Sequence, residues 1–404
     1  MNTKGSAKAG SPAEVFWAFL KLGLTSFGGP IAHLGYFRDE LVVRRKWLDE
    51  EAYGDLVALC QFLPGPASSQ VGFALGLKRS GPLGALAAWV AFTMPSAILL
   101  MVFASGTALL KGPEAQGALH GLKLVAVAVV AQAVWGMARN LTPDRARAGI
   151  ALTALFVATL LSGAFGQVGA IVVGAVAGMV LCRDDGQGSD TAQRFAVSAR
   201  TGLLALVMFG GLLAGLPLLA LATQSHAVDF VDAFYRAGSL VFGGGHVVLP
   251  LLESEVVARG WVSQDVFVAG YGATQAVPGP LFTFAAYLGA VGDPWPNGFA
   301  GALLALIAVF LPGFLVLVGA LPFWDMLRRK DWARAGMRGT NAAVVGILAA
   351  ALYDPVWTNA VRTPLDFALA AAAFSALVLW KAPPWIVVVG LVVVGSGLGL
   401  VGSL

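Results

Sequence analysis

Charged residues are scarce in this chain. Only 12% of its 404 residues are Asp, Glu, Lys or Arg, whereas 58% are hydrophobic and the mean hydropathy is +0.78. In soluble domains roughly a quarter of the residues are charged, because their surfaces face water. The composition therefore excludes a soluble protein and predicts a polytopic membrane protein.

Cysteine is nearly absent as well. The two cysteines, Cys60 and Cys182, are too few and too far apart for a disulfide framework or a thiolate metal site. The sequence also lacks a Walker loop, an HExxH motif, clustered metal ligands and a recognisable nucleophile–base pair. We therefore expect no metal, no cofactor, no enzyme activity and no ATP-driven transport by this chain alone.

The formal net charge of +4 is small, and Lys and Arg lie mainly in short loops between apolar segments. This is the positive-inside bias of membrane proteins and requires no nucleic-acid partner. The apolar segment after the polar N-terminus contains Lys21 and lacks a small-residue cleavage pattern. We therefore expect no cleaved signal peptide, a cytoplasmic N-terminus and insertion into a bacterial inner membrane.

Apolar segments alternate with short polar connections along the chain. Because lipid cannot satisfy the backbone groups of an open sheet edge, these segments predict helices. Six of them fall near 15–30, 54–77, 83–110, 118–138, 148–163 and 166–182. A stretch over 183–200 that is rich in Gly, Ser and Asp is typical of a solvated linker. Seven more segments follow near 201–224, 230–244, 266–291, 298–321, 335–353, 364–380 and 384–401.

The second set of segments repeats the first. Residues 27–30 read FGGP and residues 242–245 read FGGG, an offset of 215 residues (242 − 27). The same offset gives the pairs Glu14 with Asp229, Lys21 with Arg236, and Glu40 with Glu255. An offset of 214 then pairs Trp47 with Trp261, and Pro64-Gly65-Pro66 with Pro278-Gly279-Pro280. The chain therefore contains an internal duplication.

This duplication divides the chain into a first repeat over 1–182, a linker with an extra helix over 183–228, and a second repeat over 229–404. An odd number of crossings separates the copies, so they are inverted relative to one another, as in many secondary transporters. With 13 full crossings, the basic loop 44–46 would face outward, against the positive-inside bias. We therefore favour re-entrant segments over 15–46 and 52–77, which gives about 9–13 membrane segments in all.

Each repeat has a Pro-Gly-Pro break three residues after a glutamine, Gln61 or Gln275. Proline disfavours helix at the residue before it and suits the first turn of the next helix, so each break predicts two half-helices. A helix N-terminus binds anions through its free N–H groups and its dipole. The hydroxyl and amide side chains beside the breaks suit an oxyanion; they are Ser68, Ser69, Gln70 and Thr283. A kink that only helps helices to pack is the alternative, and the repetition of the break favours binding.

The glycines of the FGG motifs make a second pair of breaks, namely Gly28, Gly29, Gly243 and Gly244. Glycine allows close approach of the backbone to a ligand or to another helix, and both interpretations stay open here. His33, His246 and Asp55 lie near the breaks, but none has a matching residue in the other copy. They are therefore weak candidates for a proton carrier.

Lys21 and Arg236 are nearly the only charges in their segments. A cation at membrane depth costs about 2.5–3.5 kcal/mol, so it usually has a partner or lines a pathway. Two matched cations could face a doubly charged anion from both sides. Alternatively, each could reach the interface or pair with the acid seven residues before it, Glu14 or Asp229.

The blocks TSFGGPIAHLGYFRDELV and QFLPGPASSQ, with LVFGGGHVVLPLLESEVVARGW and QAVPGP in the second copy, resemble the long-chain, two-domain members of the chromate ion transporter family. The resemblance covers nearly the whole chain. It implies an inner-membrane exporter that lowers cytoplasmic chromate, confers resistance and is coupled to the membrane potential or the proton gradient. It also implies that the breaks are functional, with the first copy dominant because Ser68-Ser69-Gln70 becomes Phe282-Thr283-Phe284.

Chromate is a tetrahedral dianion close in shape to sulfate, so a carrier of sulfate or molybdate is an alternative, and so is an anion channel. The expected partners are chromate, with sulfate as its analogue, and the lipid bilayer. A homodimer is compatible with the sequence.

Overall fold

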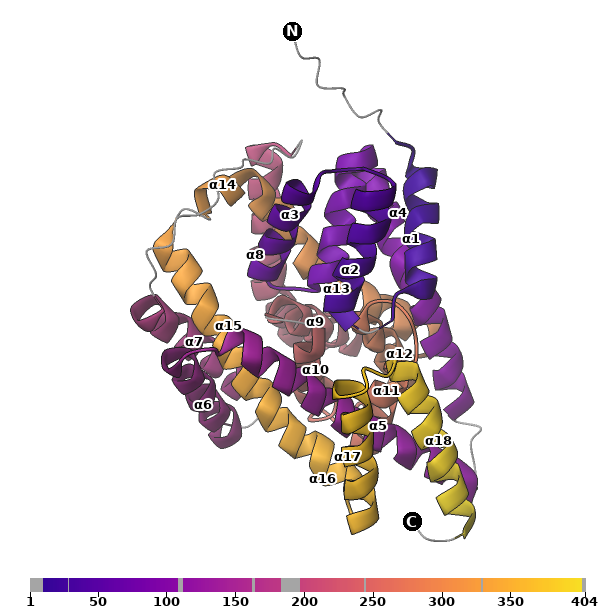
Figure 1. The fold of residues 1–404 in the computed structure, drawn as a ribbon. Coiled ribbons are helices and arrows are strands. Elements are labelled where there is room, and N and C mark those ends of the chain that lie inside the picture. Colours follow the sequence, from indigo (N-terminus) through magenta and orange to yellow (C-terminus); the bar gives the residue numbers. More distant parts are fainter. Residues whose placement is uncertain are drawn as a thin grey trace.

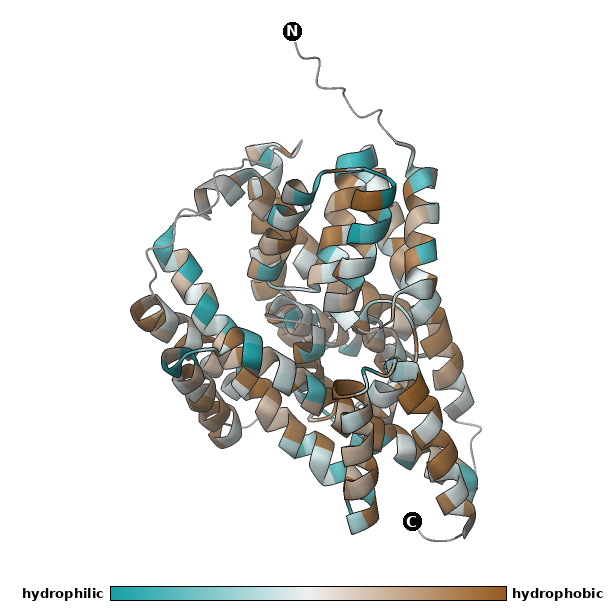
Figure 2. Cartoon of the chain, viewed as in Figure 1, coloured by the Kyte–Doolittle hydropathy of each residue, from teal (hydrophilic) through white to brown (hydrophobic). Residues whose placement is uncertain are grey.

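The chain is a bundle of helices in the computed structural model, which describes residues 10–27, 29–107, 112–161, 164–182, 197–242, 245–327 and 330–401 (Figure 1). No strand occurs in these ranges. Five of the helices are long and apolar enough to cross a membrane; they lie at Ala67–Gly106, Pro113–Leu141, Ala199–Thr223, Gly298–Phe323 and Asp331–Ala360. Hydrophobic residues dominate most helices, and hydrophilic residues are frequent at the upper ends of α1 (Pro12–Thr25), α3 (Glu50–Phe62) and α4 (Ala67–Thr107) and along α15 (Asp331–Ala351) (Figure 2). The predicted all-α polytopic membrane fold is therefore confirmed.

Both repeats begin with four short elements. In the first they are α1 (Pro12–Thr25), α2 (Gly29–Phe37) with the π-helix η1 (Arg38–Arg44), α3 (Glu50–Phe62) and the start of α4 (Ala67–Thr107). In the second they are α9 (His226–Ser239), η2 (Gly245–Val247) with α10 (Val248–Val256), α11 (Gln264–Thr274), and η3 (Leu281–Thr283) with α12 (Phe284–Val291). Polar side chains that accept a backbone N–H fix several starts, such as Ser11 before α1, Asp49 before α3 and Ser263 before α11.

Longer helices complete each repeat. After α4 come α5 (Pro113–Leu141), α6 (Arg145–Leu160) and α7 (Ala164–Leu181), and α8 (Ala199–Thr223) joins the repeats. After α12 come α13 (Gly298–Ala320), η4 (Leu321–Phe323), α14 (Trp324–Leu327), α15 (Asp331–Ala351), η5 (Leu352–Trp357), α16 (Thr358–Ala360), α17 (Pro364–Val378) and α18 (Pro384–Val401). Helix α5 packs against α17 and α18, and α15 packs against α6 and α7.

Helix α4 is two helices joined at a sharp reversal. Ser80 and Gly81 have non-helical dihedrals, and Gly81 has a φ of +68°, which favours glycine. Gly76, before the reversal, packs directly on Gly84, after it; the two backbones touch and leave no room for a β-carbon. The segment before Ser80 therefore returns toward the surface from which α3 enters, and the segment after it crosses the bundle.

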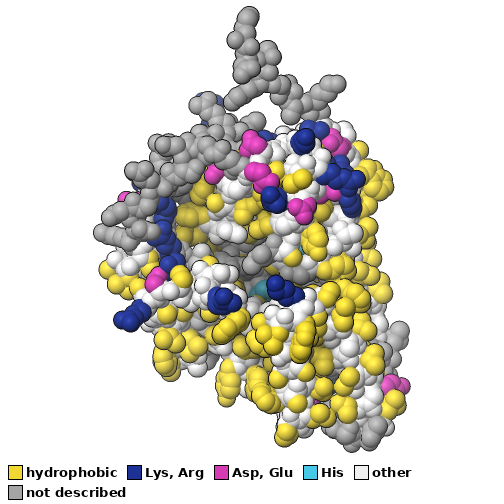
Figure 3. Space-filling model, in the orientation of Figure 1, with side chains coloured by type: hydrophobic (Ala, Val, Ile, Leu, Met, Phe, Trp, Pro, Cys, Tyr) yellow, Lys and Arg dark blue, Asp and Glu magenta, His cyan; other side chains and the backbone are white. Residues whose placement is uncertain are grey.

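The first repeat thus forms two re-entrant hairpins, one from α1 and α2–η1 and one from α3 and the first half of α4. Ion pairs tie their open ends together: Glu14 Oε1 lies 3.0 Å from Arg79 Nη2, and Glu50 Oε1 lies 2.8 Å from Arg38 Nη2. Figure 3 shows charged side chains gathered at this end of the molecule. We call this end the first mouth.

The second repeat forms the same two hairpins from α9 and η2–α10 and from α11 and η3–α12. We call their open ends the second mouth. There Arg259 Nη1 lies 2.5 Å from Asp229 Oδ1, which ties α9 to the residues after α10. Asp293 N donates a hydrogen bond to Trp261 O at 3.0 Å, which ties the residues before α11 to those after α12. Gly289 packs on Gly301 as Gly76 does on Gly84.

Helix α13 shows that the mouths face opposite sides of the membrane. Its start packs on the second mouth through Gly301, and its end contributes Val316 and Leu317 to the core of the first repeat. Gly313, the sixteenth of its 23 residues, meets Gly65 at a hairpin tip of the first repeat. A helix of 23 residues rises about 34 Å, the thickness of a bilayer core. This geometry agrees with the inverted arrangement and the re-entrant path that the sequence favoured, and it places the tips within the length of α13.

This topology predicts opposite accessibility for the two mouths. We expect Lys46→Cys to react with an impermeant maleimide only in everted vesicles, and Trp295→Cys only in intact cells. Both residues are exposed, at the first mouth and next to the second mouth respectively. The background should carry alanine at the buried Cys60 and Cys182. Labelling of both positions from one side would contradict the inverted arrangement.

Candidate functional site

The tips of the four hairpins bond to one another across the repeats. Gly65 N donates to Val241 O at 2.7 Å, and Gly279 N donates to Ser26 O at 2.9 Å. Val241 is the residue that the offset of 215 pairs with Ser26. The two hydrogen bonds are therefore one contact made twice, as expected around a pseudo-two-fold axis. Each Pro-Gly-Pro tip is held by the FGG tip of the other copy.

Glycine is required at both Pro-Gly-Pro tips. Gly65 has a φ of +118° and Gly279 a φ of +101°, in the region that side chains rarely enter. A β-carbon on Gly65 would lie 2.9 Å from the Cα of Gly313, and one on Gly279 would lie 3.0 Å from Ser96 Oγ. Gly313 follows Pro312 in α13, and Ser96 follows Pro95 in α4, so each tip also packs against the long helix of the other copy.

The first Pro-Gly-Pro separates two half-helices, as predicted: α3 ends at Phe62 and α4 begins at Ala67. The second break differs. Helix α11 ends at Thr274, and a single 3-10 turn follows Pro280 before α12 begins at Phe284. Thr283 Oγ1 donates to Pro280 O at 2.8 Å within that turn. The second α-helix therefore starts at Phe284, four residues after Pro280, whereas the first starts directly after Pro66.

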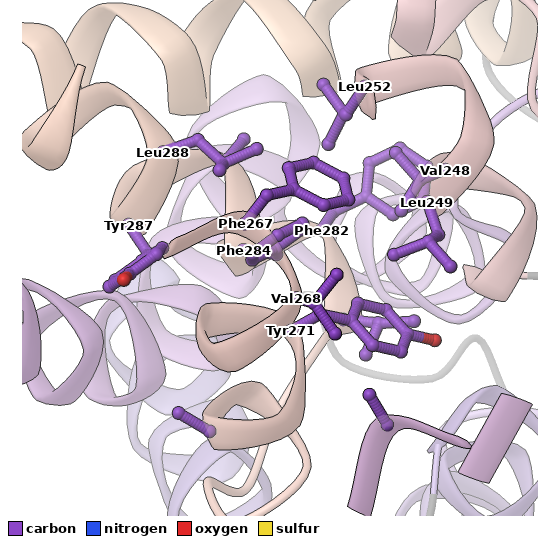
Figure 4. Close-up of a cluster of buried hydrophobic side chains, with 14 of the residues drawn as sticks. Val248, Leu249, Leu252, Phe267, Val268, Tyr271, Phe282, Phe284, Tyr287 and Leu288 are labelled. Carbon is purple, nitrogen blue, oxygen red and sulfur yellow. The ribbon is translucent and has the colours of Figure 1, made fainter. Parts of the chain in front are cut away.

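The two tips also differ in polarity. Ser68, Ser69 and Gln70 are at most 3% exposed at the start of α4. Gln70 Nε2 donates to Pro64 O and to Gly313 O, both at 2.8 Å, which ties the tip to α13. In the second copy Phe284 replaces Gln70 and packs with aromatic residues of α11 and α12 (Figure 4). The first tip therefore has more polar side chains than the second, where Gln275 and Thr283 remain.

Polar atoms with unused hydrogen-bonding capacity lie around both Pro-Gly-Pro tips. Among the described residues, the following buried atoms there have no hydrogen-bond partner: Ser26 Oγ, His33 Nε2, Ser69 Oγ, Gln70 Oε1, Thr93 Oγ1 and Gln275 Nε2. More than 90% of buried polar groups in proteins are bonded, and an orphan costs about 1–3 kcal/mol. Such a concentration is expected where a polar ligand binds.

The contacts of these residues place them together. Ser26 O accepts the hydrogen bond from Gly279 N, and His33 Nδ1 lies 3.4 Å from Ser68 Oγ. Thr93 follows Phe92, whose carbonyl is 3.2 Å from the β-carbon position of Gly279 and whose ring packs on His33. Ser26 and Thr93 were not predicted as binding residues. Ser26 lies directly before FGGP, and Thr93 lies two residues before Pro95, which are the positions that could have indicated them.

The FGG tips lie beside each other. Gly29 has a φ of +80° and its β-carbon position is 3.8 Å from His246 Nε2, while that of Gly245 is 3.1 Å from Pro30 Cγ. His246 Nδ1 lies 2.7 Å from the hydroxyl of Tyr271. Gly28, Gly243 and Gly244, which were also predicted to bind, lie outside the described residues.

Lys21 and Arg236 are not a free pair of cations at the tips. Lys21 Nζ lies 2.7 Å from Glu40 Oε2, and Arg236 Nε lies 3.0 Å from Glu255 Oε1. An arginine at a matched position also joins each glutamate, Arg45 at 2.8 Å and Arg259 at 2.9 Å, and Glu40 binds Arg44 as well, at 3.1 Å. The expected partners Glu14 and Asp229 instead bind Arg79 and Arg259. The same ion-pair cluster therefore occurs once in each copy, and anion binding by either cation stays a prediction.

Comparison with known proteins agrees with this architecture. The family model described as chromate transporter matches residues 13–182 and again 228–396. The chain belongs to the chromate transporter family. The two matched regions each contain one pair of re-entrant hairpins, and α8 lies between them.

Curated relatives extend over most of the chain. A chromate transport protein of Pseudomonas aeruginosa is 27% identical over 91% of this chain and 87% of its own length. A probable chromate transport protein of Synechococcus elongatus is 27% identical, covering 83% of this chain and 82% of its own. A chromate transport protein of Cupriavidus metallidurans is 26% identical, with coverage of 83% and 80%. No solved structure was found to match.

Proposed function

We propose that this protein is a secondary transporter that exports chromate from the cytoplasm across a bacterial inner membrane, driven by the proton motive force, and thereby confers chromate resistance. The observation that carries the proposal is the set of buried, unpartnered polar atoms around the two Pro-Gly-Pro tips. The names of the curated relatives support chromate as the substrate.

The chemistry of the tip suits a tetrahedral dianion. The N-terminus of α4 presents free backbone N–H groups and the positive end of its dipole. The hydroxyls of Ser26, Ser69 and Thr93 add donors that can point at oxyanion oxygens. The charged side chains of the hairpins, such as Lys21 and Arg236, form ion pairs with glutamates instead. Several weak dipoles in place of a full charge favour release, which an exporter requires.

The inverted repeats supply two routes to this site. One pair of hairpins opens toward the first mouth and the other toward the second, and their tips are bonded to each other. Movement of one pair therefore pulls on the other. We infer alternating access, in which chromate reaches the tips from the first mouth and leaves by the second.

Uptake of radiolabelled chromate into everted vesicles tests the proposal, with and without energisation and with sulfate as competitor. We expect saturable, energised uptake, and we expect Ser69→Ala to raise the half-saturating chromate concentration about tenfold, because one hydrogen bond to a charged group is lost. Thr153→Ala, which removes an exposed hydroxyl from α6, is the control.

Three other results of the uptake experiment would change the proposal. Uptake of sulfate or molybdate but not chromate would overturn the substrate and leave the architecture. Flux that neither saturates nor depends on energy would make the protein a channel. Unchanged chromate affinity in Ser69→Ala would remove the tip of α4 from the binding site.

A further inference from the structure

A large cavity lies apart from the hairpin tips. Its volume is about 1120 Å³, and its walls come from α4, α5, α11, α12, the start of α13 and the residue Arg362 before α17. Asp265, in the first turn of α11, and Asp293, between α12 and α13, both line it. Because these two residues belong to the second mouth, the cavity lies at the depth where the headgroups of one leaflet are found.

The inner wall of the cavity is polar and carries both signs of charge. His120 and Lys123 lie one turn apart on α5, and their side chains are only 11% and 8% exposed. Lys123 Nζ lies 2.5 Å from Asp265 Oδ1, and His120 Nε2 lies 2.6 Å from Asp366 Oδ1. The other carboxylate oxygen of Asp366 accepts the backbone N–H of Arg362 at 3.0 Å. The carboxylates thus hold the imidazole and the ammonium in place on the wall.

The rim of the cavity is apolar and faces outward. Ile98 and Val102 on α4 and Phe299 on α13 line the cavity, and their side chains are 53%, 66% and 72% exposed. In a chain that spans a membrane, such exposed apolar residues face lipid. Ile98 lies seven residues before Ser105, another lining residue, so this rim extends about 10 Å along α4 toward the middle of the bilayer.

We propose that this cavity binds a glycerophospholipid with an ammonium headgroup. Its phosphate lies beside Lys123 and Arg362, and its ammonium group lies beside Asp265 and Asp293. Its acyl chains follow Ile98, Val102 and Phe299 into the bilayer. A wall with both signs of charge matches a headgroup that carries a phosphate and an ammonium group. Since α11 and α12 form one of the moving hairpins, the bound lipid braces the second mouth.

Native mass spectrometry of the protein released from nanodiscs tests this site. The nanodiscs contain phosphatidylethanolamine and phosphatidylglycerol in equal amounts. We expect the wild type to retain one phosphatidylethanolamine, and Lys123→Met to retain at least fivefold less. This variant should fold, because Asp265 is 62% exposed and stays hydrated without its partner. Arg200→Met, at an exposed position at the start of α8, is the matched control.

A second variant tests the headgroup. Asp265→Asn should keep a bound lipid but lose the preference for phosphatidylethanolamine over phosphatidylglycerol. Equal lipid retention in the wild type and Lys123→Met would overturn the site. So would displacement of the lipid by chromate or inorganic phosphate at millimolar concentration, which would assign the cavity to a free oxyanion. The proposal is independent of chromate transport, because lipid retention is measured without any transport assay.

Discussion

Transport should be lost when Gly65 is replaced by alanine. An alanine at a φ of +118° is strained by about 1–3 kcal/mol. Its β-carbon would also lie 2.9 Å from the Cα of Gly313, a backbone atom that cannot rotate away. The tip must therefore move, which breaks the hydrogen bond from Gly65 N to Val241 O. Together these effects exceed about 3 kcal/mol, so we expect chromate uptake into everted vesicles to fall about a hundredfold or more.

Two other glycines make this prediction specific. Gly54 lies on α3 in the same hairpin and has open space around its β-carbon position, so Gly54→Ala should transport as the wild type does. Gly279→Ala should be impaired less than Gly65→Ala, because its nearest neighbour is the rotatable hydroxyl of Ser96. Normal transport by Gly65→Ala, at a normal amount of protein in the membrane, would show that the tip contact is not needed.

The sequence predicted the position of these tips but not their partners. Proline and glycine act on the local backbone, so two Pro-Gly-Pro breaks at a constant offset are visible in a single chain. The loop charges likewise gave the re-entrant path, because the membrane orients basic residues whatever the tertiary fold. The bond from Gly65 to Val241 joins residues 176 positions apart (241 − 65). No local sequence pattern specifies a contact between residues so far apart along the chain.

The same limit explains why the ion-pair partners of Lys21 and Arg236 were not predicted. Helical spacing suggested the acids seven residues earlier, on the same helix. The true partners, Glu40 and Glu255, lie on the returning arm of each hairpin, nineteen residues later in both copies. A signal was present in the sequence, because the acid and the cation are duplicated at one common offset. A hairpin model of each segment would have placed Lys21 beside Glu40 and Arg236 beside Glu255, because the two arms of a hairpin lie side by side.

Arg236→Ala should destabilise the protein by about 3–5 kcal/mol, the usual effect of removing one partner from a buried ion pair. Arg236 Nη2 lies 2.6 Å from Asp232 Oδ2, and the Asp232 side chain is only 4% exposed. Without the guanidinium this carboxylate stays buried and loses its ion-pair partner. Thermal unfolding of the purified protein in detergent measures the loss, which should lower the midpoint by several degrees.

Lys21→Ala should have a much smaller effect, although Lys21 holds the matching position. Its side chain is 49% exposed, and Glu40 keeps two arginines after the change, Arg44 at 3.1 Å and Arg45 at 2.8 Å. An exposed partner of this kind contributes about 0–1 kcal/mol. Equal destabilisation by Lys21→Ala and Arg236→Ala would contradict the asymmetry between the clusters.

The double variant Arg236→Ala/Asp232→Ala separates a structural role from a transport role. Removing both charges leaves no buried carboxylate without a partner, so stability should return toward that of the wild type. If the cluster only braces the second mouth, transport returns with it, at the wild-type half-saturating chromate concentration. A stable double variant whose uptake is still lost would instead place Arg236 on the anion pathway. The residue would then act on chromate as it moves between the tips and the second mouth.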